Sequence, residues 1–285
     1  MKITLASCYG FCLGVENALR ILRQSKQDNS EKITLLSPIV HNSLIMENIA
    51  KDGYFVLDDN RSLAEKINSL DQGTIVFSAH GHDKRLDQLA IDKGLKIIDA
   101  TCPRVKANFK SIEKALEEGD DVIFIGITNH PETLASLSLD KNIIFLDFKN
   151  PDYSVLKRGE YASVHNQTTL IQDALNPIYD VIRKYYSHVK IINDICFATK
   201  KRQQALDEVS DEDFIIVIGD KISSNSTRLF ELAKQKYPNK RVFLVNSLDE
   251  VKRINFSKNE KGFITAGAST PKEVINPIIE YLKSY

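Results

Sequence analysis

The sequence predicts an α/β protein built from three pseudo-equivalent αβα lobes, each with a mainly parallel sheet, arranged around one central site. Two observations carry this prediction. A strand–cysteine–helix pattern occurs three times along the 285 residues, and the strands that follow each copy keep nearly the same spacing. Strands that alternate with helical segments are typical of parallel sheets covered by helices.

Each copy of the pattern begins with a short apolar strand, passes through a cysteine and continues as a helix. The cysteines are Cys12, Cys102 and Cys196, at the strand-to-helix turns, and they are separated by 90 and 94 residues. A nearly constant period of this kind indicates equivalent structural units. The three copies read ITLASCYGFCLGVENALRILRQ, KIIDATCPRVKANFKSIEKALEEG and KIINDICFATKKRQQALDEV.

The helical part of the first two copies has an apolar stripe with i, i+3, i+4, i+7 spacing, which predicts one buried face. The third copy follows this spacing more weakly. The stripe residues are Val15, Ala18, Leu19 and Leu22 in the first copy, Val105, Phe109, Ile112 and Leu116 in the second, and Ala205, Leu206 and Val209 in the third.

Three further strands follow in each unit. A second strand ends in a polar turn with His41, His130 or Ser224, at 29, 28 and 28 residues after the cysteine. The third strands are YFVLDD, NIIFLDF and RVFLVNS. The fourth strands, GTIVFSAHG, YASVHNQTT and GFITAGAST, end in turns with His80, Thr168 and Ser269, at 68, 66 and 73 residues after the cysteine.

The polar turns all fall at the carboxyl ends of predicted parallel strands, where open α/β sheets bind their ligands. Three units around a pseudo-threefold axis would direct these turns into one central cavity. We expect the lobes to span residues 13–101, 102–195 and 196–285, with the N-terminal strand in residues 1–12 joining the third lobe.

The composition excludes several classes of function. With 38 Lys and Arg against 38 Asp and Glu, the chain has no charge excess that would favour nucleic acid or an anionic membrane. The first residues, MKITLASCYG, show no apolar signal stretch, and no apolar run is long enough to span a membrane. We therefore expect a cytoplasmic protein with no membrane partner, whose four cysteines are free for ligation or catalysis.

One cysteine from each unit indicates a shared metal cluster, because the ligands of a CxxC-type zinc finger come in local pairs. Thiolates are the usual ligands of iron–sulfur clusters, and a cubane held by three of them leaves one iron open for substrate. A zinc ion with three cysteines and an open water position is the alternative metal. Three buried structural cysteines are the remaining interpretation. Cys8 has no counterpart in the other units, so we leave it out of the cluster. We expect a buried neighbour, and a spare thiol near the metal is the alternative.

The polar turns offer hydroxyl, amide and imidazole groups, several of them at predicted helix starts, where backbone N–H groups attract anions. A phosphate or diphosphate would suit them, whereas the sequence has neither a P-loop nor a dinucleotide fingerprint. The alternative for any single residue is a helix cap or a satisfied turn residue. The candidates are His41, His80, His130, Thr168, Ser223, Ser224, Asn225 and Ser269.

Glu132 is the one carboxylate in these turns with a candidate catalytic role. It lies two residues after His130 in the segment NHPE, in a turn expected to face the cavity. A positioned glutamate can deliver protons. The alternative is an acid favoured at a helix start, with Pro131 as the first helical residue.

Nine short motifs occur in order along nearly the whole chain, and together they resemble the LytB/IspH family. Its members are the 4-hydroxy-3-methylbut-2-enyl diphosphate reductases of the non-mevalonate isoprenoid pathway. The motifs are GFCLGV, IVHN, SAHG, DATCP, NHPE, QTT, DICFAT, SSNS and AGAS.

The resemblance implies a three-lobed α/β fold around one 4Fe-4S cluster, bound here by Cys12, Cys102 and Cys196, with one open iron for the hydroxyl oxygen of the substrate. Two electrons from an external donor such as a ferredoxin or flavodoxin, together with protons, would remove that hydroxyl as water. The products would be isopentenyl and dimethylallyl diphosphate, the last step of the pathway.

The resemblance also implies residue roles. Glu132 would be the proton donor, and Thr168 would complete the proton path to the leaving hydroxyl. His130 would lie beside the diphosphate and join these two residues in the catalytic set. The diphosphate itself would be bound by His41, His80, Ser223, Ser224, Asn225 and Ser269.

Two other function classes fit an iron–sulfur centre. A hydro-lyase would remove water at an open iron without net electron transfer, and a requirement for an external reductant distinguishes it from the reductase. A cluster-bearing sensor would be expected to carry a basic DNA-binding helix, and the sequence shows none.

Overall fold

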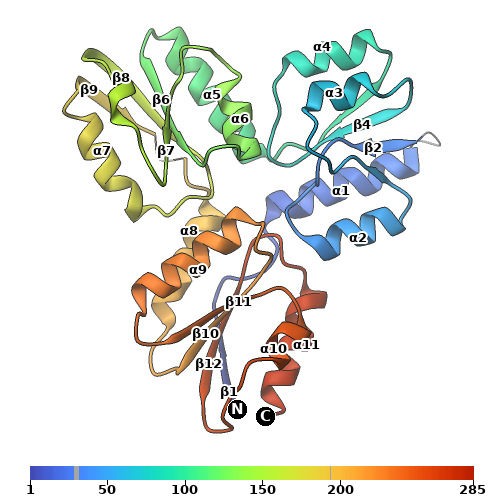
Figure 1. The fold of residues 1–285 in the computed structure, drawn as a ribbon, viewed down its shortest axis with the longest axis vertical. Helices are drawn as coiled ribbons and strands as arrows, with labels where there is room; N and C mark the ends of the chain where they lie inside the picture. The colour runs from blue at the N-terminus through green and yellow to red at the C-terminus, as the bar shows by residue number, and fades with distance from the viewer. Residues whose placement is uncertain (29–31, 193) are drawn as a thin grey trace.

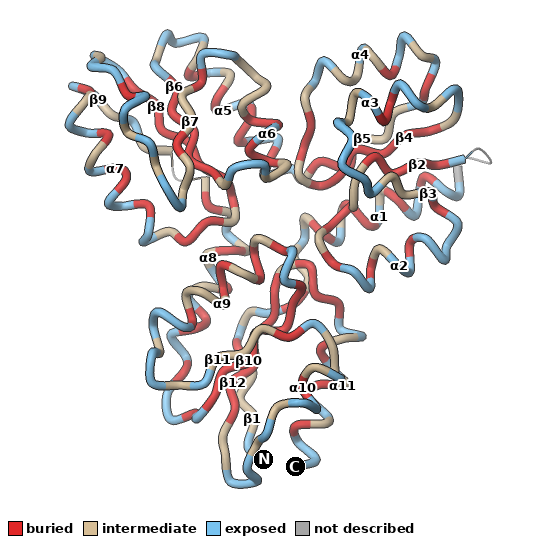
Figure 2. The backbone as a smooth tube through the Cα atoms, in the orientation of Figure 1, coloured by how far each residue is buried: buried red, intermediate tan, exposed pale blue. Residues whose placement is uncertain are grey.

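Three four-stranded sheets form the framework of the protein, one in each of three lobes around a common centre (Figure 1). The computed structural model describes residues 1–28, 32–192 and 194–285. Within these described ranges, every strand pairing is parallel. The predicted class, three α/β lobes with parallel sheets, is therefore confirmed. The central strands form the buried interior of each lobe, and the helices expose their outer faces (Figure 2).

The first lobe has the strand order β3-β2-β4-β5. Successive residues of β4 face opposite sides of the sheet: Val76 packs with α1 and α2, whereas Ile75 and Phe77 pack with α3 and α4. The sheet is therefore covered on both faces. The elements are α1 (Leu13–Asp28), β2 (Ile33–Leu35), α2 (Ser43–Lys51), β3 (Phe55–Val56), α3 (Leu63–Asn68), β4 (Thr74–Phe77), α4 (Arg85–Asp92) and β5 (Lys96–Asp99).

The second lobe repeats this arrangement with the order β7-β6-β8-β9. Phe124 of β6 packs against α5 and α6 on one face, and Ile123 and Ile125 pack against α7 on the other. The elements are α5 (Pro103–Glu117), β6 (Asp121–Gly126), α6 (Pro131–Leu137), β7 (Ile144–Asp147), η1 (Tyr153–Val155), β8 (Gly159–Asn166), η2 (Asp173–Leu175), α7 (Asn176–Ile182) and β9 (Tyr186–Ile191).

The third lobe has the order β1-β12-β10-β11 and contains both chain termini (Figure 1). Ile216 of β10 packs with α10 and α11, and its neighbours Ile215 and Val217 pack with α9. The elements are β1 (Lys2–Leu5), α8 (Phe197–Gln204), η3 (Ala205–Glu208), β10 (Phe214–Ile218), α9 (Ser224–Lys236), β11 (Arg241–Val245), α10 (Leu248–Lys252), β12 (Lys261–Ala266) and α11 (Lys272–Lys283).

Each copy of the strand–cysteine–helix pattern crosses from one lobe to the next. Strand β1 pairs with β12 of the third lobe, whereas α1 packs in the first lobe. Likewise β5 lies in the first sheet and α5 in the second lobe, and β9 lies in the second sheet and α8 in the third lobe. The three cysteines therefore occupy the crossover points between lobes, which is why they meet near the common centre.

The structure differs from the sequence-based expectation in two elements. Strand β2 ends at Leu35, well before the polar turn at His41, because Pro38 cannot donate to a sheet ladder. Helix α8, which follows the third cysteine, ends at Gln204, and the chain continues as the 3₁₀ turn η3. Ala205, Leu206 and Val209 are nevertheless buried as predicted. No helix among the described residues is both long and apolar enough to cross a membrane.

Candidate functional site

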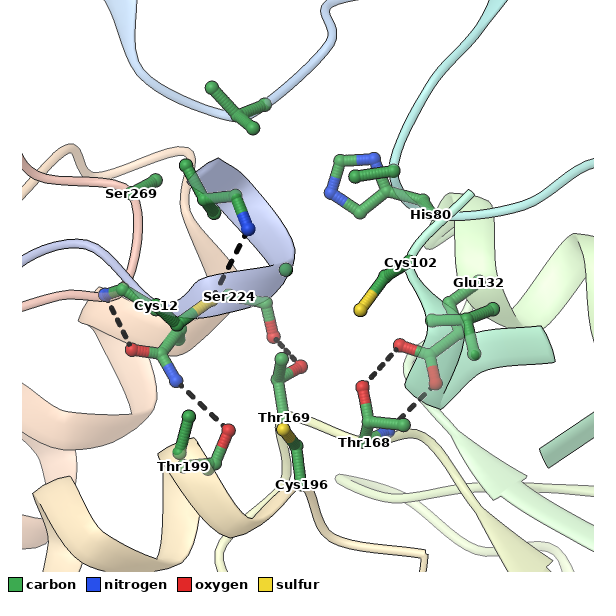
Figure 3. A pocket seen from close by; sticks show the side chains of 18 of the residues that line it. Cys12, His80, Cys102, Glu132, Thr168, Thr169, Cys196, Thr199, Ser224 and Ser269 are labelled. Carbon is green, nitrogen blue, oxygen red and sulfur yellow. Dashed lines mark hydrogen bonds between the residues drawn. The ribbon is translucent and has the colours of Figure 1, made fainter. Parts of the chain in front are cut away.

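All twelve residues predicted for the site lie on one central cavity where the lobes meet (Figure 3). Every lobe contributes, because the turns at the carboxyl ends of its strands open toward the same space. The lining residues from the prediction are Cys12, Cys102, Cys196, His41, His80, His130, Glu132, Thr168, Ser223, Ser224, Asn225 and Ser269.

The three cysteines lie at the N-terminal ends of three helices. Cys102 and Cys196 are the N-cap residues of α5 and α8, and Cys12 immediately precedes α1. The backbone N–H of Val15 donates to Cys12 Sγ at 3.4 Å. Cys12 Sγ thus accepts a backbone N–H at a helix start, and burial raises the pKa of Cys102 against the smaller, opposing effect of the backbone N–H groups of Arg104 and Val105.

Backbone hydrogen bonds tie each cysteine to a polar turn of the preceding sheet. The N–H of Cys12 donates to the Ala268 carbonyl at 3.1 Å, and that of Cys196 donates to the Thr168 carbonyl at 3.0 Å. The N–H of Cys102 donates to the carbonyl of Ala79, beside His80, at 3.0 Å. The same bond in all three lobes fixes each thiol against a turn that carries a predicted substrate-binding side chain.

Gly14 provides the space in which two of these thiols approach each other. A Cβ atom on Gly14 would lie 2.6 Å from Cys102 Sγ and 3.7 Å from Cys12 Sγ. Burial raises the pKa of Cys102, and the nearby Cys12 and Cys196 add to this effect. The thiols thus form a compact, partly desolvated donor set.

The sequence left open a zinc ion in place of a cluster, and it left open the role of Cys8. Among the residues that the structure describes, no group of three or more His, Cys, Asp or Glu side chains is placed to hold a single metal ion. Cys8 is free and does not line the cavity. It is half-buried, not buried as expected, and it packs against the apolar cluster between β10 and α9.

The three histidines form a group at one side of the cavity. The ring centroid of His41 lies 4.4 Å from that of His80 and 6.1 Å from that of His130. Burial lowers the pKa of all three, to about 4 for His130 and well below the ordinary value for His80. His130 Nδ1 accepts the Glu132 N–H at 3.2 Å, so its neutral ring carries the proton on Nε2. The group therefore presents neutral hydrogen-bond donors.

The hydroxyl and amide groups come mainly from the third lobe. Ser223 is the N-cap of α9, and its hydroxyl accepts the Ser226 N–H at 3.4 Å. The Asn225 side chain accepts the Ala268 N–H at 3.0 Å and donates to Thr199 Oγ1 at 3.2 Å. These bonds hold the start of α9 against the last polar turn of the same lobe.

Glu132 and Thr168 form a buried pair across the second lobe (Figure 3). The Thr168 N–H donates to Glu132 Oε1 at 2.9 Å, and the Thr168 hydroxyl donates to Oε2 at 2.9 Å. Burial raises the pKa of Glu132 to about 7, although both hydrogen bonds from Thr168 oppose the shift. The carboxyl group can therefore hold a proton at neutral pH and release it into the cavity.

Besides the apolar residues Val40, Ala79, Ala198 and Ala268, four lining residues were not singled out from the sequence: Gly14, Arg104, Thr169 and Thr199. Three of them lie within motifs of the family resemblance: Gly14 in GFCLGV, Thr169 in QTT and Thr199 in DICFAT. Membership in these motifs was the signal that could have identified them. Arg104 follows DATCP by one residue and carries no separate signal. Among the described lining residues it is the only Lys or Arg.

Comparisons with known proteins agree with this geometry. The family model described as "LytB protein" matches residues 3–283. A 4-hydroxy-3-methylbut-2-enyl diphosphate reductase from Geobacillus kaustophilus is 36% identical over 292 aligned positions, covering 100% of this chain and 91% of the relative.

Two solved structures share the fold. The E-1-hydroxy-2-methyl-but-2-enyl-4-diphosphate reductase from Plasmodium falciparum matches with a TM-score of 0.85 and 26% identity, covering 99% of this chain and 88% of that one. An (E)-4-hydroxy-3-methyl-but-2-enyl diphosphate reductase, described as the terminal enzyme of the non-mevalonate pathway, matches with a TM-score of 0.68 and 26% identity over 100% of this chain and 99% of that one. The chain therefore belongs to the LytB family of 4-hydroxy-3-methylbut-2-enyl diphosphate reductases.

Proposed function

We propose that this chain removes the hydroxyl group of 4-hydroxy-3-methylbut-2-enyl diphosphate by reduction and releases isopentenyl and dimethylallyl diphosphate. One observation carries the proposal: three thiols, three neutral imidazoles and a buried carboxyl group from different lobes line a single cavity. The overall change adds two electrons and two protons, breaks one C–O bond and forms one C–H bond and water.

We assign Cys12, Cys102 and Cys196 as the ligands of one 4Fe-4S cluster with one open iron. The donor set fits, because thiolates are the usual ligands of such clusters and helix starts stabilise their charge. The missing side chain of Gly14 also leaves space beside Cys102 and Cys12. When bound, the cluster would supply electrons singly and offer a Lewis-acidic iron to the substrate hydroxyl.

We assign the histidine group and the hydroxyl side chains of the third lobe to the diphosphate. Neutral imidazoles, serine hydroxyls and the start of α9 bind an anion through donors rather than through a basic patch. This matches a chain with equal numbers of acidic and basic residues. The binding residues are His41, His80, His130, Ser223, Ser224, Asn225 and Ser269.

We assign Glu132 as the proton donor and Thr168 as its partner. A carboxyl group with a pKa of about 7 is protonated in roughly half of the molecules at neutral pH, which suits general acid catalysis. The Thr168 hydroxyl can donate to the carboxylate or accept from the carboxylic acid. Protonation turns the departing hydroxide into water, and Glu132 is then reloaded from solvent.

The electrons would come from an external one-electron donor such as a ferredoxin or flavodoxin. The test uses enzyme purified without oxygen, 4-hydroxy-3-methylbut-2-enyl diphosphate and reduced methyl viologen. We expect oxidation of the viologen that depends on substrate, together with both C5 diphosphate products. Water loss without consumption of reductant would indicate a hydro-lyase and would contradict the proposal.

A further inference from the structure

One hydrogen-bonded contact outside the predicted site joins the first lobe to the third. Asp220 follows β10 in the third lobe, and its Oδ2 accepts two hydrogen bonds from Ser43, the first residue of α2 in the first lobe. The Ser43 N–H donates at 3.0 Å and the Ser43 hydroxyl at 2.6 Å, across 177 positions of sequence. Asp220 is only 5% exposed.

Both ends of this contact lead directly to residues on the cavity. Ser43 lies two residues after His41, and the carbonyl of His41 accepts the Ser269 hydroxyl at 3.3 Å. On the other side, the carbonyl of Asp220 accepts the Ser223 N–H at 3.1 Å, at the start of α9. The contact therefore connects the first-lobe histidine to the third-lobe serine turn.

Charge makes this contact stronger than an ordinary surface hydrogen bond. Burial raises the pKa of Asp220, but the hydrogen bonds from Ser43 and from its own turn outweigh this effect, so the net pKa is lowered. The carboxylate is thus ionised at neutral pH and lies at the positive end of α2. A hydrogen bond to a charged group contributes more stabilising free energy than a hydrogen bond between neutral groups.

We propose that Asp220 is a positioning residue whose bond to Ser43 sets the distance between His41 and the Ser223–Asn225 turn, and so shapes the diphosphate site. This inference rests on the proposed function, since it concerns binding of the same substrate. Asp220 and Ser43 do not line the cavity, and they act through their neighbours. The Glu132–Thr168 pair lies in the second lobe and is not affected by this contact.

At the start of α2, one substitution can remove both hydrogen-bond donors of Ser43 without disrupting the helix. Ser43 is the first residue of the helix, where proline is favoured, and the preceding Asn42 has the extended conformation (φ −152°, ψ 116°) that proline requires before it. The helix α6 of the second lobe begins with Pro131 in the same place. Ser43→Pro should therefore delete the N–H and the hydroxyl while α2 remains formed.

The second lobe offers a matched control. Asp152 Oδ1 accepts the Ser154 N–H at 3.0 Å and the Ser154 hydroxyl at 2.6 Å, which is the same geometry within a single lobe. Asp152→Asn should weaken this local turn without changing substrate binding, because neither Asp152 nor Ser154 lines the cavity. Ser43→Thr keeps both donors and should behave like the wild type.

The experiment compares Ser43→Pro, Asp220→Asn and their double variant as cluster-loaded enzymes, with steady-state kinetics and calorimetric binding of inorganic pyrophosphate. We expect KM and the pyrophosphate Kd to rise about tenfold or more, because a hydrogen bond to a charged group is worth at least that factor. We expect kcat to stay within about threefold and iron and sulfide content to stay unchanged, since the effect is on binding. The double variant should match the more affected single variant.

Unchanged KM and Kd in both single variants would overturn the inference, as would a double variant whose effect equals the product of the two single effects. A similar rise in Asp152→Asn would also overturn it, because the effect would then be general destabilisation. The proposed function fails separately, if the wild type does not reduce the substrate at all; pyrophosphate binding then still tests the role of Asp220.

Discussion

The Glu132 carboxylate accepts two hydrogen bonds from Thr168, one from the backbone N–H and one from the hydroxyl, each at 2.9 Å. The two residues are 36 positions apart: Glu132 lies in the first turn of α6, which follows β6, and Thr168 follows the neighbouring strand β8. This pair combines a buried acid with a hydroxyl that can pass a proton in either direction.

Glu132→Gln should lower turnover by about 10²–10⁴-fold, the usual loss when a general acid is removed. The glutamine amide can keep both contacts with Thr168, so the site should remain formed. Turnover is measured anaerobically with reduced viologen, and the cluster is checked by electron paramagnetic resonance. Glu117→Gln, an exposed change at the end of α5, is the control. Near-normal turnover in Glu132→Gln would contradict the proton-donor role.

The same substitution should change how stability depends on pH. Between about pH 4.5 and 7 folded Glu132 keeps its proton while the unfolded chain has lost it, so wild-type stability falls as pH rises through this window. The Glu132→Gln variant does not lose stability in this way, because a glutamine side chain carries no ionisable proton. Its free energy of unfolding should exceed that of the wild type by an amount that grows to about 3 kcal/mol above pH 7.

Urea unfolding of both proteins at pH 5 and pH 8 measures this difference. Effects of the buried histidines are common to both proteins and cancel. A stability difference that does not increase between the two pH values would mean that the pKa of Glu132 is not raised.

Thr168→Val should reduce turnover by about tenfold or more, because it removes the hydroxyl that contacts Glu132 while it keeps the side-chain volume. The backbone N–H bond to Oε1 remains in this variant. Thr168→Ser restores a hydroxyl and should recover most of the activity. Equal rates for the valine and serine variants would show that the hydroxyl takes no part in proton transfer.

Cys102→Ser should lose most of its bound iron and sulfide, whereas Cys8→Ser should keep both. The two residues differ in position: Cys102 lines the cavity with Cys12 and Cys196, and Cys8 packs against the core of the third lobe. Iron and sulfide analysis of anaerobically purified protein measures the result. A fully assembled, active cluster in Cys102→Ser would refute its assignment as a ligand.

Gly14→Ala should impair cluster assembly, because its Cβ would lie 2.6 Å from Cys102 Sγ and displace that thiol. We expect a clear reduction in iron and sulfide per chain with little change in thermal stability. Gly119→Ala is the comparison: it introduces strain at φ +81° and has no atom within 4 Å of the new methyl group. It should lower stability by about 1–2 kcal/mol and leave the cluster content unchanged.

The sequence was sufficient to predict the architecture, because the signals involved are local. Short apolar strands and helical stripes reflect the local conformation of the backbone, and the repeat of the cysteines placed one thiol in each unit. The weak third stripe at Ala205 was also informative, since the chain there forms a short helix followed by a 3₁₀ turn. The early end of β2 was missed, although Pro38 was the available signal.

By itself, the sequence determined three α/β units, polar turns at the ends of their strands and twelve of the side chains that line the cavity. Only the tertiary structure decided how these groups are paired. The bond from Thr168 to Glu132, the close approach at Gly14 and the contact of Asp220 with Ser43 each join segments that are remote in sequence. Periodicity fixes which face a residue takes, whereas distances and pKa values depend on how the three lobes pack and on how much water they exclude.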